Sequence, residues 1–396
     1  MAAPVIAPMT RDELTHWLRL SLTPGVGLGA ARKLLAAFGL PEAIFRQPLS
    51  ALLQVVSPAQ ASALRNKPTD LGGRVELTWQ WLQEQTEQRR VVALGETHYP
   101  TALLSIEDPP LLLYLMGRVD LAPDPSRSIA MVGSRNPTPQ GVLNARQFAK
   151  SLHQAGLTIV SGLALGVDGA SHEGALEAAG TDAPTLATIA VVGTGLDRVY
   201  PKSHHALAHR IALNGLLVSE YHLGTPPLAP NFPRRNRLIS GLSCATLVVE
   251  AALKSGSLIT ARLAAEQGKE VFAIPGSIHA TQSHGCHALI RQGAKLVETA
   301  QDVLEDLPSA SSWAAAWATS QGDAAKDASP QEADSDGTES DEALLTALGF
   351  DPVSLDALQA RTGLDTPHLQ ARLMTLELDG AVTRLSGGLF QRLMKT

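Results

Sequence analysis

The sequence predicts an α/β core, built as a doubly wound and mostly parallel sheet, between an N-terminal helical unit and a small C-terminal unit. Five short apolar or β-branched runs each lead to Gly or Ser and then into helical sequence, which is typical of a parallel sheet with helices on both faces. These runs are Ile129–Val132, Leu157–Val160, Thr188–Val192, Ala245–Val249 and Glu270–Ile274. Ligands of such sheets bind beyond the carboxyl ends of the strands, so the loops after these runs are the candidate functional segments.

The chain of 396 residues is too long for one ordinary core, and its composition changes along its length. We expect a helical unit over residues 1–88, the α/β unit over 89–308, a linker over 309–341 and a last unit over 342–396. The linker is rich in Ala, Ser, Asp and Gln without apolar periodicity, which predicts disorder. The acidic stretch over residues 321–342 contributes −7 to the net charge of −6 and leaves the rest of the chain at +1, so a local basic cleft is compatible with the composition.

Composition also excludes several classes of protein. The two cysteines are too few for a disulfide framework, and the longest apolar runs, such as Leu111–Met116, are far too short to span a membrane. We therefore expect a cytoplasmic protein without membrane insertion. We also expect no metal and no cofactor. The pair His205 and His209 lacks a metal motif, and the group at 279–287 lacks the spacing of a zinc site.

The N-terminal unit contains a Pro-Gly-x-Gly turn between two helical patterns, at residues 24–27. This is a helix-hairpin-helix pattern, in which the first amides of the second helix can meet a phosphate. Packing without DNA binding is the alternative, and the sequence leaves both open. A dinucleotide-binding loop is excluded, because no strand precedes the turn and the third glycine has the wrong spacing.

Three loops of the α/β unit carry small residues and cations. The first predicted strand leads into Gly133, Ser134 and Arg135, which offer close backbone approach, a hydroxyl and a forked cation suited to phosphate. The second leads into Ser161-Gly162 and then Asp168, which we interpret as a loop-bracing acceptor rather than a catalyst. Beyond the third strand, Lys202 is a candidate phosphate contact.

The segment 231–242 places three arginines around an asparagine, directly after an aromatic residue. Arginines beside a ring supply phosphate contacts and a face on which a base can stack, as single-strand binding requires. The candidates are Phe232, Arg235, Asn236 and Arg237, and we expect one of the three arginines (the third is Arg234) to brace a neighbouring loop instead. A fourth loop, with Ser255 and Gly256, opens a helix whose amides can share an anion.

The last unit resembles a winged helix: a helical pattern over Pro367–Leu378 is followed by a strand pair around residues 386–388. Its five basic and five acidic residues between 351 and 395 balance. A neutral winged helix reads duplex DNA poorly, so binding of a protein partner is at least as well supported.

Five ordered motifs carry a resemblance that covers essentially the whole chain. They are Gly-Ser-Arg-Asn-Pro-Thr at 133–138, Ser-Gly-x-Ala-x-Gly-x-Asp at 161–168, Gly-x-Gly-x-Asp-x-x-Tyr-Pro at 193–201, Phe-Pro-x-Arg-Asn-Arg-x-Ile at 232–239 and Ser-Gly-Ser-Leu-Ile-Thr-Ala at 255–261. Together they resemble the DNA-processing protein A (DprA/Smf) family. The resemblance implies a Rossmann-like core flanked by a SAM/helix-hairpin-helix-like domain and a winged helix. It also implies a homodimer that binds single-stranded DNA, protects incoming DNA and loads the RecA recombinase during natural transformation.

Carried over by motif, the DNA contacts implied by the resemblance fall on twelve positions, Arg237 included with the arginine cluster. They are Gly133, Ser134, Arg135, Ser161, Gly162, Lys202, Phe232, Arg235, Asn236, Arg237, Ser255 and Gly256. The chain departs from the family pattern at Leu165, Ser171 and His287, where Arg, Ala and Asn are common. The loss of an arginine at position 165 either weakens the affinity for DNA or only removes a surface contact, and the sequence leaves both open.

The main alternative is an enzyme on the same core, because the α/β unit also resembles nucleotide-phosphoribohydrolases. Those enzymes need a glutamate three residues after the threonine of their Gly-rich loop. Here Thr260 is followed by Ala261, Arg262 and Leu263, so the carboxylate is missing. The loops at 133 and 193 do not complete a dinucleotide fingerprint either. We therefore expect no enzymatic activity and no catalytic residue.

Overall fold

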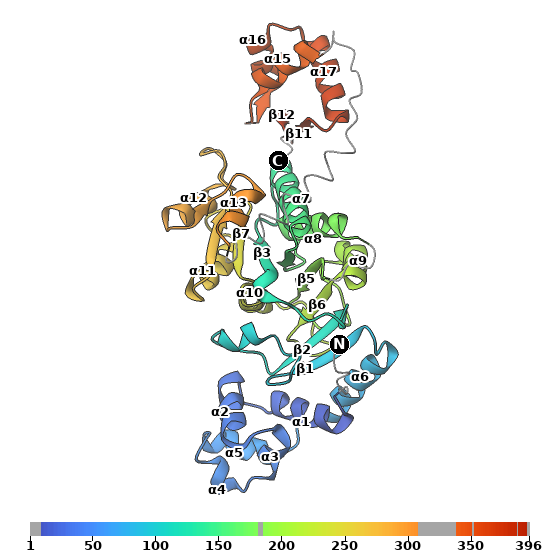
Figure 1. Ribbon diagram of the computed structural model, residues 1–396, viewed down its shortest axis with the longest axis vertical. Helices are drawn as coiled ribbons and strands as arrows, with labels where there is room; N and C mark the ends of the chain where they lie inside the picture. The colour runs from blue at the N-terminus through green and yellow to red at the C-terminus, as the bar shows by residue number, and fades with distance from the viewer. Residues whose placement is uncertain (1–8, 181–184, 308–337, 351, 386, 394–396) are drawn as a thin grey trace.

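The computed structural model describes residues 9–180, 185–307, 338–350, 352–385 and 387–393. Its centre is a nine-stranded sheet with helices on both faces, and a second sheet of three strands lies in the C-terminal unit (Figure 1). The doubly wound fold expected from the sequence is confirmed. Nearly all of the expected linker at 309–341 lies outside the described residues.

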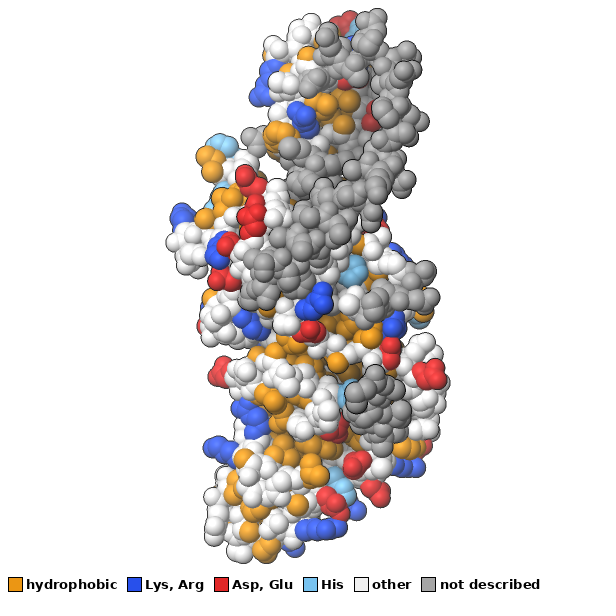
Figure 2. Space-filling model, in the orientation of Figure 1, with side chains coloured by type: hydrophobic (Ala, Val, Ile, Leu, Met, Phe, Trp, Pro, Cys, Tyr) orange, Lys and Arg blue, Asp and Glu red, His pale blue; other side chains and the backbone are white. Residues whose placement is uncertain are grey.

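The N-terminal unit is helical, as expected. Its helices are α1 Arg11–Leu22, α2 Leu28–Phe38, α3 Pro41–Arg46, α4 Leu49–Leu52, α5 Pro58–Arg65 and α6 Leu71–Glu84. Capping boxes at Thr10 and Ser57 start α1 and α5 by satisfying amides of the first turn. In the turn between α1 and α2, Gly25 has φ +75°, a conformation that favours glycine. On the face drawn in Figure 2, basic and acidic side chains are interspersed over this unit.

The large sheet has the strand order β1-β2-β6-β5-β4-β3-β7-β8-β9. Its strands are β1 Arg89–Ala93, β2 Leu112–Gly117, β3 Ser128–Val132, β4 Thr158–Ser161, β5 Thr188–Val191, β6 Leu216–Ser219, β7 Ala245–Val248, β8 Glu270–Ala273 and β9 Lys295–Leu296. Pairing is parallel from β6 to β9, whereas β2 runs antiparallel to both β1 and β6. The five predicted strands are confirmed as β3, β4, β5, β7 and β8.

Helices cover the sheet in two layers (Figure 1). One face packs against α7 Pro139–Gln154, α8 Val167–Ala178, α9 His205–Asn214 and α13 Ala300–Glu305. The other packs against α10 Asn231–Gly241, α11 Ser257–Glu266 and α12 His284–Arg291, with the 3-10 turn η1 Thr101–Ser105. Each parallel strand alternates between these two cores: Ile129 and Met131 of β3 face α7, whereas Ala130 and Val132 face the opposite layer.

The order of the parallel strands reverses direction at β3. From β3 the chain builds outward through β4, β5 and β6, and it then returns to the other side of β3 to build β7, β8 and β9. The loops after β3 and β7 therefore diverge to opposite sides of the sheet. Such a switch point leaves a crevice at the carboxyl ends of the strands, which is where doubly wound folds bind their ligands.

The N-terminal helices dock on the sheet beside β1 and β2, and their apolar core continues into that of the sheet (Figure 1). His222, in the loop after β6, joins the two parts. Its Nδ1 lies 2.8 Å from the Tyr114 hydroxyl on β2, and its Nε2 lies 3.2 Å from the Ser21 hydroxyl on α1. Arg74 of α6 adds a hydrogen bond to the carbonyl of Leu223.

We expect this junction to weaken in acid. Burial, aided by the Arg74 charge, lowers the pKa of His222 to about 4. His222 therefore takes up a proton near pH 6.5 in the unfolded chain but only near pH 4 in the folded chain. The free energy of unfolding falls as the pH drops between these two values. At pH 5 the loss from His222 should be about 2 kcal/mol. Urea unfolding at about pH 7.5 and about pH 5 measures it: His222→Gln should lose about 2 kcal/mol less than wild type. Equal losses would contradict the assignment.

The C-terminal unit is a winged helix, as expected. It contains α15 Thr338–Leu348, β10 Val353–Ser354, α16 Leu355–Thr362, α17 Thr366–Leu378, β11 Val382–Arg384 and β12 Leu389–Arg392, with strand order β10-β12-β11. Two apolar side chains of α17, Met374 and Leu378, are 64% and 79% exposed. In the described part of the chain, no helix is both long and apolar enough to cross a membrane.

Candidate functional site

A cavity of about 520 Å³ opens at the switch point between the ends of β3 and β7. It is lined by the loop after β3, the loop after β4, the first turns of α10 and the loop that leads into α11. The lining residues are Val132, Gly133, Ser134, Arg135, Ala164, Asp168, Phe232, Pro233, Arg235, Asn236, Ala252, Lys254, Ser255, Gly256, Ser257, Ile259, Thr260 and Gln282. Segments up to 150 residues apart in the sequence thus meet at one edge of the sheet, as the parallel topology requires.

The loop after β3 is tied to β7 by Glu250. The Glu250 carbonyl accepts a hydrogen bond from the Ser134 amide at 2.6 Å. Its carboxylate accepts one from the Thr138 amide at 2.8 Å and one from the Thr138 hydroxyl at 2.5 Å. Gly133 is required here because a Cβ would lie 2.9 Å from that same carbonyl. The backbone that carries Arg135 is therefore fixed, whereas the Arg135 side chain itself is exposed.

Arg135 lies over the ring of Phe232, with its guanidinium carbon 5.9 Å from the ring centroid. Phe232 in turn contacts Tyr200, whose ring centroid is 5.4 Å away. Gly193 leaves room for the Phe232 ring, because a Cβ at position 193 would lie 3.2 Å from a ring carbon. A cation and two rings, from the loop after β3, the start of α10 and the loop after β5, thus form a contiguous row beside the cavity. A cation over a ring is attracted by the negative face of the ring.

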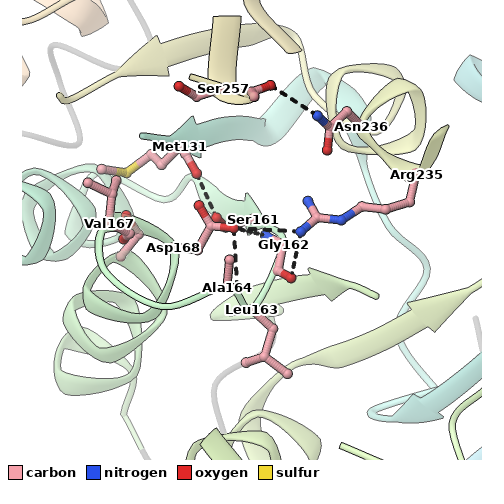
Figure 3. Close-up of polar contacts among 12 residues, drawn as sticks. Met131, Ser161, Gly162, Leu163, Ala164, Val167, Asp168, Arg235, Asn236 and Ser257 are labelled. Carbon is pink, nitrogen blue, oxygen red and sulfur yellow. Dashed lines mark hydrogen bonds and ion pairs between the residues drawn. The ribbon is translucent and has the colours of Figure 1, made fainter. Parts of the chain in front are cut away.

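Arg235 and Asp168 form a buried ion pair beneath the cavity (Figure 3). The Arg235 guanidinium reaches from α10 to the Gly162 carbonyl at 2.8 Å and lies 3.8 Å from the Asp168 carboxylate. Asp168 accepts hydrogen bonds from the amides of Gly162 and Ala164, so its predicted bracing role is confirmed. Burial raises the pKa of Asp168, while the guanidinium and these amides oppose that shift. Leu163, between the two amides, has φ +59°, a strained conformation that this network holds in place.

Two of the three arginines in the 231–242 segment therefore brace the fold, one more than expected. Besides Arg235, Arg237 donates to the Glu220 carboxylate at 2.5 Å, and both side chains of this pair are largely buried. Arg234 is exposed. Asn236 also supports a neighbouring loop, because its Nδ2 donates to the Gly256 carbonyl at 3.3 Å.

Eight of the twelve predicted contact residues line the cavity, including Arg135 and Phe232. The fully buried Ser161 donates to the Met131 carbonyl at 2.6 Å, and Gly162 lies directly beneath the Arg235 guanidinium, where no side chain fits. Ser161 and Gly162 therefore lie behind the cavity lining and support it. Lys202, in the 3-10 turn η3 Lys202–His204, is exposed but does not line the cavity. Arg237 is held by Glu220 outside the lining.

Three further residues at this site were not among the twelve predicted contacts. Lys254 is exposed in the cavity wall beside Ser255. Its position after a predicted strand and directly before Ser-Gly could have identified it as a phosphate contact. Gln282 binds the loop after β3, because its amide donates to the Asn136 carbonyl at 3.1 Å and accepts from the Ser134 hydroxyl at 3.3 Å. Tyr200 is the third. Neither Gln282 nor Tyr200 carries a local sequence signal for its contact.

The carboxylates near the cavity are occupied by structural bonds. Asp168 binds two amides and Arg235, and Glu250 binds Thr138. Burial raises the pKa of Glu250, and its two bonds to Thr138 counteract the shift. Among the described residues, no group of three or more His, Cys, Asp or Glu side chains is placed to hold a metal ion. What the cavity presents to a ligand is cations, hydroxyls, a glycine-rich backbone and the ring of Phe232.

Comparison with known proteins decides the family. Residues 90–308, more than half of the chain, match the model for DNA recombination-mediator protein A, and residues 325–388 match that for the DprA winged helix domain. The chain belongs to the DprA family. Protein Smf of Escherichia coli K12 is 39% identical to it over 315 residues, which cover 79% of this chain and 80% of that protein.

Two further members of the DprA family extend the comparison. DNA processing protein DprA of Bacillus subtilis is 40% identical over 261 residues, covering 65% of this chain and 85% of that protein. The solved structure of DprA from Streptococcus pneumoniae superposes with a TM-score of 0.60 at 36% identity, over 76% of this chain and 99% of that one. The resemblance seen in the sequence motifs is therefore confirmed, together with the Rossmann-like core and the winged helix of the DprA fold.

Proposed function

We propose that this DprA-family chain binds single-stranded DNA in the switch-point cavity, protects it after uptake and delivers it to the RecA recombinase in the cytoplasm during natural transformation. We propose a homodimer as the functional unit. The observation that carries the proposal is the row of Arg135, Phe232 and Tyr200 at the mouth of the cavity. Membership in a family described as DNA recombination mediators supports the same role.

The chemistry of the cavity favours an unpaired strand. Exposed Arg135 and Lys254 in its wall, with Lys202 nearby, provide phosphate contacts, whereas Phe232 provides a face for a base. Single-strand binders combine these features, and the stacking is independent of base identity. A base within a duplex is already stacked on both sides and cannot cover the ring. The winged helix, whose five basic and five acidic residues balance, adds no net positive charge for duplex DNA.

We propose that the buried Arg235, Gly162 and Ser161 act on DNA indirectly. Their polar groups are engaged with the protein, and their burial keeps them from a phosphate. They hold the loop after β4 against α10 and so define the floor of the cavity. Direct contacts then fall to the exposed residues and to the lining residues whose polar groups are not engaged in structural bonds, with Arg135 as the principal one.

The decisive experiment compares binding with turnover. In a fluorescence titration, the purified chain should bind a single-stranded oligonucleotide and bind the matching duplex far more weakly. It should release neither base nor phosphate from ATP, NAD or nucleoside monophosphates, because both nearby carboxylates are committed to structural bonds. Hydrolysis that copurifies with the protein would favour the phosphoribohydrolase-like alternative, and equal affinity for duplex would contradict the proposed site.

A chain that ends at Leu307 should bind single-stranded DNA at least as tightly as the full chain. The truncation removes the acidic stretch between residues 321 and 342, which carries −7 and repels the phosphate backbone. It also removes the winged helix, for which we propose a protein partner. Titration of both forms at low salt checks this, and their difference should shrink at high salt because screening weakens the repulsion. Markedly weaker binding by the shorter chain would instead assign the winged helix a part in DNA contact.

A further inference from the structure

Tyr200 is an exposed ring beside the cavity rather than inside it. Its side chain does not line the cavity, yet its ring centroid lies 5.4 Å from that of Phe232, with 39° between the ring planes. Tyr200 is 48% exposed, so roughly half of an aromatic residue faces solvent at the mouth of the site. Burial in the protein core therefore does not account for its position.

The backbone that carries Tyr200 is held in place from both sides. Beyond it, the Nδ1 of His204 lies 3.0 Å from the Leu163 carbonyl, and Gly169 leaves the space that the imidazole occupies. Before it, the Asp197 carboxylate accepts a hydrogen bond from the Gly224 amide at 2.8 Å. The ring is thus presented on a segment that is fixed to the loops after β4 and β6.

Hydrogen bonds also hold the backbone that carries Phe232. The Asn231 side chain donates to the Gly193 carbonyl at 3.0 Å, and the Tyr221 hydroxyl donates to the Asn231 carbonyl at 3.2 Å. These bonds fix the start of α10, from which the Phe232 ring projects toward Tyr200. Two rings held by independent networks form a surface that is ready before any ligand arrives.

Two cations belong to the segments that carry or contact these rings. Arg135 lies over Phe232, and Lys202 follows Tyr200 by two residues in the chain and is exposed. The loop after β3 therefore brings a cation to Phe232, and the segment after β5 carries both Tyr200 and an exposed lysine. An alternation of π faces and cations matches the alternation of bases and phosphates along an unpaired strand.

We propose that Tyr200 is a second base-stacking position, which receives the nucleotide beyond the one on Phe232 while Lys202 contacts a phosphate beside it. This inference rests on the proposed binding of single-stranded DNA. It extends the site past the cavity, toward η3. The ligand is a run of at least two unpaired nucleotides, read without regard to base identity because every base has a π face.

Three substitutions at position 200 separate stacking from packing. Tyr200→Phe keeps the ring and should bind single-stranded DNA like wild type. Tyr200→Ala should bind about 5- to 100-fold more weakly, with an unchanged salt dependence, because a stacking contact carries no charge. Tyr200→Leu keeps an apolar cover over Phe232 without a π face and should be as weak as Tyr200→Ala. Leu213→Ala is the matched control. It truncates an exposed apolar side chain on α9, away from position 200, and should leave the affinity for single-stranded DNA unchanged.

A crosslinking experiment on the wild-type chain gives an independent readout. Oligonucleotides with 5-iododeoxyuridine at successive positions should crosslink at Phe232 and, one nucleotide further along, at Tyr200. If wild type binds single-stranded DNA but Tyr200→Leu binds equally well and no crosslink forms at Tyr200, the second stacking position is wrong and the proposed function stands. If wild type does not bind single-stranded DNA at all, the proposed function itself fails.

Discussion

Replacing Arg235 by Ala should lower the free energy of unfolding by about 3–5 kcal/mol, as expected when one partner of a buried ion pair is removed. Arg235 and Asp168 have side chains only 6% and 8% exposed, so the carboxylate left behind is poorly hydrated and keeps two backbone amides but no countercharge. The Gly162 carbonyl loses its donor at the same time. The strained backbone at Leu163 then loses the group that holds the loop against α10.

Urea unfolding measures this effect, and the neighbouring Arg234 provides the control. Arg234 lies on the same helix but is exposed, so Arg234→Ala should change stability by less than about 0.5 kcal/mol. The double variant Arg235→Ala/Asp168→Ala should be more stable than the sum of the single losses predicts, because it removes the orphaned charge. Additive losses would mean that the two side chains do not act as a pair.

Replacing Phe232 by Ala should cost about 1–3 kcal/mol of single-strand binding energy with little change in salt dependence, the effect of a lost stacking contact. Arg135→Ala should also weaken binding for every base sequence, but it should in addition reduce the log–log salt slope by about 0.7, the contribution of one phosphate contact. The two losses should not be additive, because the guanidinium rests on the ring and each variant disturbs the position of the other group.

Titration of single-stranded DNA at several salt concentrations checks both variants. Lys150→Ala is the control for charge, since this lysine is exposed on α7 and does not line the cavity. It should leave affinity and slope close to those of wild type. An Arg135→Ala variant with wild-type affinity and slope would show that the loop after β3 does not contact the DNA.

The sequence predicted the five central strands of the parallel sheet, but it predicted neither its outer parallel strands β6 and β9 nor the antiparallel strands β1 and β2. Each predicted strand is a buried apolar run that leads into a loop and a helix, and that repeating unit is a strong signal. By contrast, β1 and β2 form an antiparallel pair at the edge, and only the short 3-10 turn η1 lies between them. The four residues of β6 follow α9 almost at once, and a short apolar run there is indistinguishable from the end of the helix.

The site shows the same division between local and tertiary information. Arg135 could be selected because its loop directly follows a strand. The sequence also contains a signal for the burial of Arg235. Leu238, Ile239 and Leu242 follow it at spacings of three, four and seven residues, which places all four side chains on one buried face of the helix. Arg237 and Tyr200 are different, because their partners Glu220 and Phe232 lie 17 and 32 residues away. No local sequence pattern predicts contacts between residues this far apart in the chain.

The attachment of the loop after β3 to Glu250 has a consequence for the kinetics of binding. Because the backbone that carries Arg135 is bonded to β7 through Ser134 and Thr138, the protein has little rearrangement to make when a strand enters. The ordering cost of association then falls almost entirely on the nucleic acid. Encounter should be rapid and steered by charge, and differences in affinity among variants of the rings should appear mainly as differences in how long a strand stays bound.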